Sequence, residues 1–345
     1  MSEVASPSPA HANPRVAVIV PAYGVAEFLG AALDSVLAQS FQDWECVVID
    51  DGAPDDVAGA VAPYLADPRI RFLATANQGV AAARNTAIAA STAPLVALLD
   101  GDDLIRPDYL AEIVRALDSD PRVRLVTVNA EMFGAVTPGK LCFEEKQGKG
   151  DGVRGTLADV LDRSFGVYIG SAFRRADFDR IGGFDAGLTL CEDLDLWVQL
   201  MLLGGDAYYV DRVLADYRVR AGSASSKTQK MLTGVIEVYQ KAQAALPADA
   251  PEQPLLARLI AENEEALEFE RAVDQIVAGN AREGVARLRK TRRQVQGPVW
   301  TASFALWRLF PGLARPMLSW RRQAHARGGA PQGLSALSAL VGFGV

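Results

Sequence analysis

The chain has 345 residues, half of them hydrophobic and 22% charged, which suits one large domain or two ordinary ones and excludes wholesale disorder. Its formal net charge of −7 argues against general nucleic-acid binding. The charge is uneven, because residues 281–345 hold 11 lysines or arginines against one acid, Glu283. That segment carries about +10 and leaves about −17 for the rest, which indicates two parts with different partners.

The cysteines and histidines limit the kinds of catalytic and metal site that the chain can form. Cys46, Cys142 and Cys191 are odd in number and far apart, so we expect a reducing cytoplasm and neither a zinc site nor a disulfide framework. The only histidines, His11 and His325, lie near the two ends, which argues against a Ser-His-Asp triad and most zinc hydrolases. A general base should therefore be a carboxylate.

The ends of the chain look different from its middle. The first 14 residues lack the basic and apolar regions of a signal peptide, and no apolar segment reaches membrane-spanning length. We expect a disordered tail over 1–13, a catalytic domain over 14–228, a helical region over 229–328 and a flexible tail over 329–345.

Strands and helices alternate along the first 130 residues. Short apolar runs predict buried strands, and helical spacing of apolar residues predicts the helices between them. This alternation is typical of an open, mostly parallel α/β sheet flanked by helices. In chain order we predict a strand over 15–24, a helix over 25–40, a strand over 44–50, a helix over 54–66 with Pro54 in its first turn, a strand over 69–75, a helix over 79–91, a strand over 94–100, a helix over 107–120 and a strand over 123–130.

Ligands of such sheets bind beyond the carboxyl ends of the strands. Three of the predicted strand ends carry residues that often form binding sites, at Pro21–Tyr23, Asp50–Gly52 and Asp100–Asp103. Asp and Gly also form ordinary turns, which explains one such end more easily than three together. The dinucleotide and Walker glycine patterns are absent, so a bound nucleotide must be held by other means. Crowded aspartates can hold one through a divalent metal that bridges phosphate oxygens.

Six segments of the chain resemble, in the same order, those of family 2 inverting glycosyltransferases of the GT-A fold. The resemblance covers roughly residues 14–226. It implies a GT-A sheet with a C-terminal helical extension, and an enzyme that moves a sugar from a nucleotide-sugar, UDP-linked, to a saccharide, lipid-linked or protein acceptor. It also implies Mg²⁺ or Mn²⁺ as cofactor and a role in cell-surface polysaccharide or glycoconjugate synthesis. The segments are VAVIVPAYG, VVIDDGAPDD, NQGVAAARNTAI, ALLDGDDLIRPDYL, IGGFDAGLTLCEDLDLW and YRVRAGSASS.

The resemblance assigns a group of residues to the donor nucleotide. Asp51 matches the carboxylate that accepts a hydrogen bond from uracil, and Arg84 is expected at the diphosphate. The alternatives are a core position for Tyr23 and a solvated position for Arg84. The donor-binding set is Pro21, Ala22, Tyr23, Glu27, Asp51, Asn77, Gly79, Arg84, Asp100, Asp102 and Arg220.

Asp100-Gly101-Asp102 is the D-x-D signature of this family, extended here by Asp103. The resemblance implies that Asp102 or Asp103 contacts the metal, and that Asp100 binds ribose hydroxyls or a water of the metal. Arg220 stands where relatives often carry a histidine that can ligand the metal. Arginine cannot ligand a cation but can pair with diphosphate oxygens, so a metal here would rest on fewer protein ligands than in those relatives.

Asp193 matches the general base that removes the proton from the acceptor hydroxyl, on the face opposite the leaving group. The alternative is that acids here only stabilise the start of a helix. Residues 132–155 are rich in Gly and Lys, and we expect a mobile loop near the acceptor. The acceptor-side candidates are Gly170, Ser171, Glu192 and Trp197.

The last third of the chain changes character. Residues 253–293 predict two helices broken at Gly279-Asn280, like one unit of a helical hairpin repeat. Residues 299–322 mix tryptophans with arginines, which suits a helix on an anionic membrane surface. The alternative is packing on the catalytic domain with snorkelling arginines. The residues concerned are Trp300, Trp307, Trp320, Arg308, Arg315, Arg321 and Arg322.

Two other functions compete with glycosyl transfer. A haloacid-dehalogenase-type phosphohydrolase would use Asp100 as nucleophile and Asp102 as acid. That motif usually comes early and continues with Thr, whereas here three βα units precede it and Leu104 follows Asp103. A non-catalytic sugar- or protein-binding module would have no need of both Asp102 and Asp193.

Overall fold

The structure is a computed structural model in which the chain forms two compact units. Unit 1 consists of Met1–Ala221 with Ala245–Glu252, and unit 2 of Gly222–Ala244 with Gln253–Val345. The expected tails lie outside the described residues, apart from Asn13. The predicted domain bounds remain a prediction. The structure describes residues 13–136, 139–143, 152–220, 228–291 and 295–319.

Unit 1 is built on one mixed sheet with the strand order β3-β2-β1-β4-β8-β6-β9-β5, and β7 pairs with β9. The sheet is parallel from β3 to β4, whereas β8 runs antiparallel to both of its neighbours. The five predicted strands are confirmed. The strands are β1 (Val16–Ala22), β2 (Trp44–Asp50), β3 (Ile70–Ala74), β4 (Leu95–Leu98), β5 (Leu104–Ile105), β6 (Val123–Gly134), β7 (Val153–Gly155), β8 (Ala172–Arg174) and β9 (Asp206–Val219).

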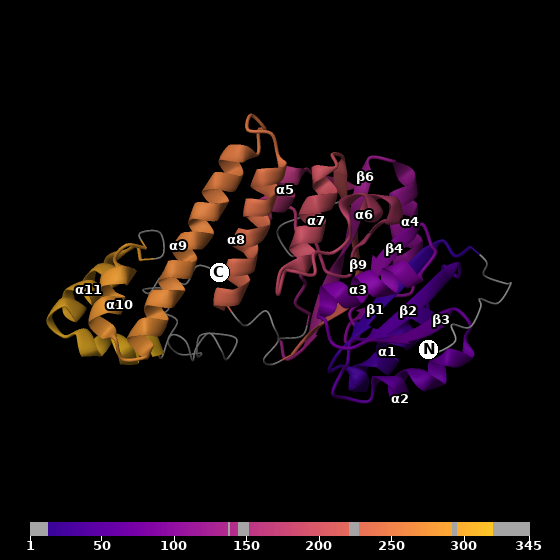
Figure 1. The fold of residues 1–345 in the computed structure, drawn as a ribbon, viewed down its shortest axis with the longest axis horizontal. Coiled ribbons are helices and arrows are strands. Elements are labelled where there is room, and N and C mark those ends of the chain that lie inside the picture. Colours follow the sequence, from indigo (N-terminus) through magenta and orange to yellow (C-terminus); the bar gives the residue numbers. More distant parts are fainter. Residues whose placement is uncertain (1–12, 137–138, 144–151, 221–227, 292–294, 320–345) are drawn as a thin grey trace. The chain divides into compact units, whose positions relative to one another are not determined.

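Alternate side chains of the parallel strands point to opposite faces of the sheet, and both faces are buried. Val16 and Val18 of β1 join one apolar cluster with residues of α1, α2 and α4, while Ala17 and Ile19, which alternate with them along the strand, are also fully buried. Figure 1 shows the helices of unit 1 around this sheet. They are α1 (Ala26–Leu37), α2 (Val57–Val61), α3 (Val80–Ala90), α4 (Tyr109–Ser119), α5 (Leu157–Leu161), α6 (Arg175–Ile181) and α7 (Glu192–Leu202).

Two predicted segments have different bounds in the structure. The helix expected from Pro54 begins only at Val57, because Asp56 is its N-cap and accepts a hydrogen bond from the Gly59 N–H at 2.8 Å. The expected mobile loop over 132–155 is partly wrong, since β6 continues to Gly134 and β7 pairs with β9. Residues 137–138 and 144–151 of that segment lie outside the described residues.

Unit 2 is helical, with α8 (Thr228–Ala245), α9 (Gln253–Val277), α10 (Ala281–Leu288) and α11 (Pro298–Leu309). The predicted break at Gly279-Asn280 is confirmed. Gly279 has φ +110°, a conformation that suits glycine after a helix, and Asn280 is the N-cap of α10. At Gly284 an added Cβ would lie 2.4 Å from Ile276 Cγ1, so this glycine allows α10 to approach α9 closely.

The predicted membrane role of the tryptophans is wrong for the two that the structure describes. Trp300 and Trp307 are 7% and 2% exposed, and their rings meet edge to face at 6.1 Å inside the core of unit 2. Trp320, Arg321 and Arg322 lie outside the described residues. Among the helices that the structure describes, none is long and apolar enough to cross a membrane.

Candidate active site

The carboxyl ends of β1, β2 and β4 lie side by side at one edge of the sheet. Ala22 pairs with Asp50 on one side of β1, and Ile19 pairs with Leu98 on the other. The turn after β4 packs against the end of β1, because a Cβ on Gly101 would lie only 3.1 Å from the carbonyl oxygen of Pro21. The three strand ends that the sequence singles out, those of β1, β2 and β4, are therefore neighbours in space.

The residues expected around the base lie at this edge. The Tyr23 side chain is 52% exposed, so a core position for it is excluded. Asp51 is 4% exposed, and its two carboxylate oxygens accept hydrogen bonds from the backbone N–H groups of Gln78 and Gly79, each at 2.9 Å. Asp51 thus ties the exposed loop of Asn77 and Gly79 to β2, and each oxygen keeps a lone pair for a ligand.

Asp55 is a site residue that the sequence reasoning missed. Its carboxylate accepts hydrogen bonds from the N–H groups of Gly24 at 2.9 Å and Ala26 at 2.7 Å, and so holds the turn that leads into α1. Burial is the largest single effect and would raise the pKa of Asp55, but the backbone donors together outweigh it and lower that pKa. The expected acid, Glu27, is exposed in the first turn of α1. The sequence signal for Asp55 was the second pair of acidic residues in the segment DDGAPDD, residues 50–56.

Arg84 lies between two acids and is buried, which excludes the solvated position, while its expected place at the diphosphate stays a prediction. The side chain is 3% exposed, with Nη2 at 2.7 Å from Asp100 Oδ1 and Nη1 at 2.9 Å from Glu192 Oε1. Burial alone would lower the pKa of Arg84, but the two carboxylates outweigh it and raise the pKa. Arg84 therefore joins the D-x-D turn to the start of α7, where Asp193 follows Glu192.

Asp103 is a poor candidate for a metal ligand. Asp103 is 1% exposed. Its two carboxylate oxygens accept hydrogen bonds from the backbone N–H of Arg218 at 2.7 Å and from the Tyr168 hydroxyl at 2.8 Å. Burial and the nearby charge of Asp100 raise the pKa of Asp103. The structure thus favours Asp102, and it adds Tyr168 and Arg218 as residues that shape the turn.

The end of β9 is attached to the D-x-D turn through two arginines. The guanidinium of Arg218 lies 4.3 Å from the ring centres of both Phe28 and Phe133, and its Nε donates to the carbonyl oxygen of Asp102 at 2.8 Å. Arg220 Nε lies 2.8 Å from Asp102 Oδ2. Strand β5 follows the turn directly and pairs with β9, which explains why these distant segments meet.

The start of α7 presents the candidate base. Asp193 is half-buried at the second position of the helix, and its Oδ1 accepts a hydrogen bond from the Leu194 N–H at 2.8 Å. Burial, with a further contribution from Asp193, raises the pKa of Glu192 against the opposing effect of Arg84. Cys191, just before the helix, has φ +66°, a strained conformation for a residue other than glycine.

Three of the four acceptor-side candidates are buried instead of lining a surface. Ser171 is fully buried, and its hydroxyl donates a hydrogen bond to Thr127 Oγ1 at 3.0 Å. The carbonyl of Gly170 accepts a hydrogen bond from the buried Tyr109 hydroxyl at 2.8 Å. Trp197 is 2% exposed and packs in the core. Of the four, Glu192 lies at the start of α7, where it pairs with Arg84.

The acids of the D-x-D turn do not fit a divalent cation as they are arranged. Asp102 Oδ2 is taken by Arg220, Asp100 Oδ1 by Arg84, and both oxygens of Asp103 have other partners. Within the described ranges, no group of three or more His, Cys, Asp or Glu side chains could hold a metal ion. Asp100 and Asp102 therefore each already have a guanidinium as counter-charge.

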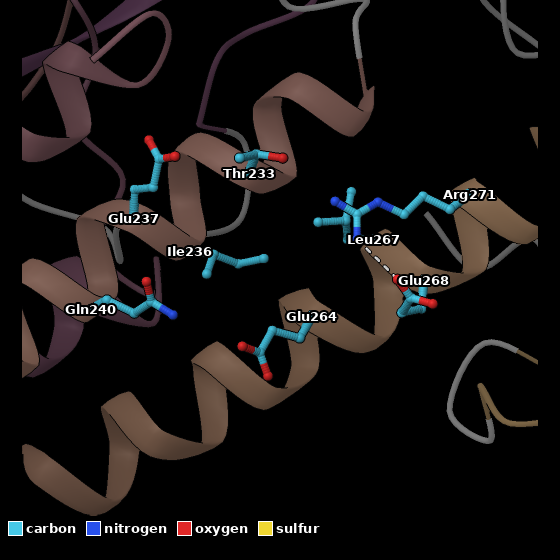
Figure 2. A pocket seen from close by; sticks show the side chains of 8 residues that line it. All are labelled: Thr233, Ile236, Glu237, Gln240, Glu264, Leu267, Glu268 and Arg271. Carbon is cyan, nitrogen blue, oxygen red and sulfur yellow. Dashed lines mark hydrogen bonds and ion pairs between the residues drawn. The ribbon is translucent and has the colours of Figure 1, made fainter. Parts of the chain in front are cut away.

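A separate pocket of about 450 Å³ lies in unit 2, between α8 and α9. Figure 2 shows that Arg271 points toward Glu268, with which it forms an ion pair. None of the predicted site residues lines this pocket. Its lining residues are Thr233, Ile236, Glu237, Gln240, Glu264, Leu267, Glu268 and Arg271.

Comparisons with known proteins agree with the fold and the motifs. Residues 17–182 match the model of glycosyl transferase family 2. The succinoglycan biosynthesis protein ExoO of Rhizobium meliloti is 28% identical over 220 residues, which cover 61% of this chain and 63% of ExoO. The chain spans about a quarter to a third of the length of several other curated relatives that it matches.

Two solved structures share the fold. S. aureus TarS 1-349 in complex with UDP-GlcNAc superimposes with a TM-score of 0.60 at 17% identity, covering 92% of this chain and 93% of that one. The mannosyltransferase PcManGT from Pyrobaculum calidifontis, in complex with GDP-Man and Mn²⁺, gives a TM-score of 0.55 at 21% identity, covering 90% and 88%. The chain has the GT-A fold, and its residues 17–182 match glycosyl transferase family 2.

Proposed function

We propose that unit 1 transfers a sugar from a UDP-sugar to an acceptor hydroxyl with inversion at the anomeric carbon. The observation that carries this proposal is the ion-pair chain of Asp100, Arg84 and Glu192, which brings the acids after β4 to the start of α7. A donor held at the strand ends would then have its anomeric carbon near Asp193. Geometry of this kind lets one residue act on the acceptor while others hold the donor.

The chemical step needs a base and a site for the leaving group. The acceptor oxygen forms a bond to the anomeric carbon while its proton passes to the Asp193 carboxylate. The bond from that carbon to the diphosphate oxygen breaks, and its electron pair leaves with the nucleoside diphosphate. Tyr23 and Asp51 would hold the base, and Asp102 with Arg220 would lie at the diphosphate.

The phosphohydrolase alternative has less support from the arrangement of the acids. Asp100, which would be its nucleophile, is paired through Oδ1 with the buried Arg84. Such pairing weakens a nucleophile because the carboxylate charge is already compensated. The family match also makes a non-catalytic module unnecessary as an explanation.

We further propose that the enzyme acts in the cytoplasm, in polysaccharide or glycoconjugate synthesis. The name of ExoO, a succinoglycan biosynthesis protein, supports the polysaccharide role. The UDP-GlcNAc complex of TarS supports a UDP-linked donor. The Mn²⁺ in PcManGT supports the expected divalent metal, whereas the arrangement around Asp102 speaks against it.

A donor panel tests the proposed reaction. The full chain is mixed with UDP-, GDP- and dTDP-sugars, with EDTA and with Mn²⁺, and its thermal unfolding is followed. We expect one UDP-sugar to raise the unfolding temperature, because a ligand that binds only the folded state stabilises it. Release of UDP from that donor should follow when acceptors are added. No stabilisation by any nucleotide-sugar would contradict the proposal.

We also propose a peripheral contact of unit 2 with anionic membranes, through residues other than the tryptophans. Leu309 and Phe310 are 74% and 59% exposed at the end of α11, and the exposed Arg308 and Arg315 flank them. Apolar side chains beside cations favour an anionic bilayer surface.

Vesicle flotation tests this contact. The chain should float with phosphatidylglycerol vesicles and stay behind with neutral phosphatidylcholine vesicles. Leu309→Asp combined with Phe310→Ser should cut the bound fraction several-fold. Leu65→Asp, at an apolar residue of unit 1 that is 45% exposed, is the matched control. Equal flotation of both variants would rule out this surface.

A further inference from the structure

Arg220 spans the two loops between which a donor diphosphate would lie. Its Nε is 2.8 Å from Asp102 Oδ2, and its Nη1 donates to the carbonyl oxygen of Gly24 at 3.0 Å. Gly24 belongs to the turn after β1, and Asp102 to the turn after β4. The guanidinium therefore lies across the edge where the ends of these strands meet, and its side chain is still 40% exposed.

The neighbour of Arg220 on β9 contacts the same turn. Arg218 lies near the end of β9, and Arg220 follows two residues later, just beyond the strand. Arg218 is held between Phe28 and Phe133 and bonded to the Asp102 carbonyl. Arg220 also lies 5.9 Å from the Phe28 ring centre. The charge of Arg220 is thus presented at a defined place before any ligand binds.

The same place is where a metal-dependent enzyme would carry its cation. Asp100 and Asp102 are the acids of the turn nearest to such a cation, and each already has a guanidinium as partner, Arg84 for Asp100 and Arg220 for Asp102. A guanidinium offers five N–H donors in a planar fork that matches phosphate oxygens, and it stays charged at any working pH. It can therefore neutralise a diphosphate without an added ion.

We propose that Arg220 is the fixed cation of the donor site, that its guanidinium binds the diphosphate of the nucleotide-sugar while Asp102 orients it, and that transfer needs no divalent metal. This inference rests on the proposed function. When the bond between the anomeric carbon and the diphosphate oxygen breaks, the electron pair stays on the diphosphate, and Arg220 balances the added negative charge. The acceptor proton goes to Asp193, so the step requires no further reactant.

Nucleotide binding to the full chain, measured by calorimetry, tests this role. The probes are UDP and uridine, each with EDTA and with Mn²⁺, and GDP and dTDP are run beside UDP. Wild type should bind UDP equally well with EDTA and with Mn²⁺. Arg220→Ala should bind UDP about 10- to 100-fold more weakly in EDTA, because charge-assisted hydrogen bonds to phosphate are lost, and should bind uridine as wild type does.

Controls separate this effect from unfolding. Arg220→Gln keeps a donor for Asp102 without the charge and should lose UDP affinity in the same way. Arg212→Ala removes another arginine that bridges two acids, Asp108 and Glu112, and should bind UDP like wild type. Wild-type binding of UDP only with Mn²⁺, or unchanged UDP affinity in Arg220→Ala, would overturn the inference. Failure of wild type to bind any of the nucleotides would instead count against the proposed function.

Discussion

Asp193→Asn should lower the transfer rate by about 10²- to 10⁴-fold and leave UDP affinity unchanged, if Asp193 is the general base. An amide cannot take the proton of the acceptor hydroxyl. The helix start should survive the change, because the amide oxygen can still accept the hydrogen bond from the Leu194 N–H. Initial rates of UDP release with saturating donor and acceptor measure the loss, and calorimetry with UDP measures binding.

The matched control is Asp43→Asn, the same chemical change at an exposed acid just before β2. Asp43 lies at the opposite end of the parallel strands from the site, since it precedes the strand whose carboxyl end carries Asp50. Its transfer rate should match wild type. Near-full activity of Asp193→Asn would refute the base assignment and leave helix stabilisation as the role of this acid.

Arg84→Met should reduce the free energy of unfolding of unit 1 by about 3 kcal/mol, because it leaves two acids without their buried counter-charge. Asp100 and Glu192 have side chains only 30% and 14% exposed, so water compensates them incompletely. Urea unfolding followed by near-UV circular dichroism measures the change. Transfer activity should fall as well, since Arg84 joins the D-x-D turn to the start of α7.

Arg212→Met serves as the control for stability. Arg212 also bridges two acids, but it is 47% exposed, and surface pairs contribute under about 1 kcal/mol. The double variant Arg84→Met with Glu192→Gln should recover part of the loss, because one of the stranded charges is then removed. Equal stability of the Arg84→Met and Arg212→Met variants would show that the buried ion pairs of Arg84 contribute no more to the free energy of unfolding than the exposed ion pairs of Arg212.

Much of unit 1 could be predicted because its signals are local. The five predicted strands and the helices between them follow from runs of apolar residues with a clear period, such as Val16–Val20 with Leu29, Leu33 and Val36 of α1. The later strands were missed because β5, β7 and β8 span only two or three residues and β9 mixes polar with apolar positions.

The sequence by itself determined which acids stand at the strand ends, because a parallel sheet places all its carboxyl ends on one edge. Only the tertiary structure decided what those acids contact. The burial of Arg84 between Asp100 and Glu192, and the meeting of Asp102 with Arg220, join segments about 100 residues apart. Such pairs leave no periodic pattern in the sequence, since they depend on how β5 pairs with β9 and how α7 packs on the sheet. For the same reason Ser171 and Trp197 resembled site residues in the sequence and prove to be core.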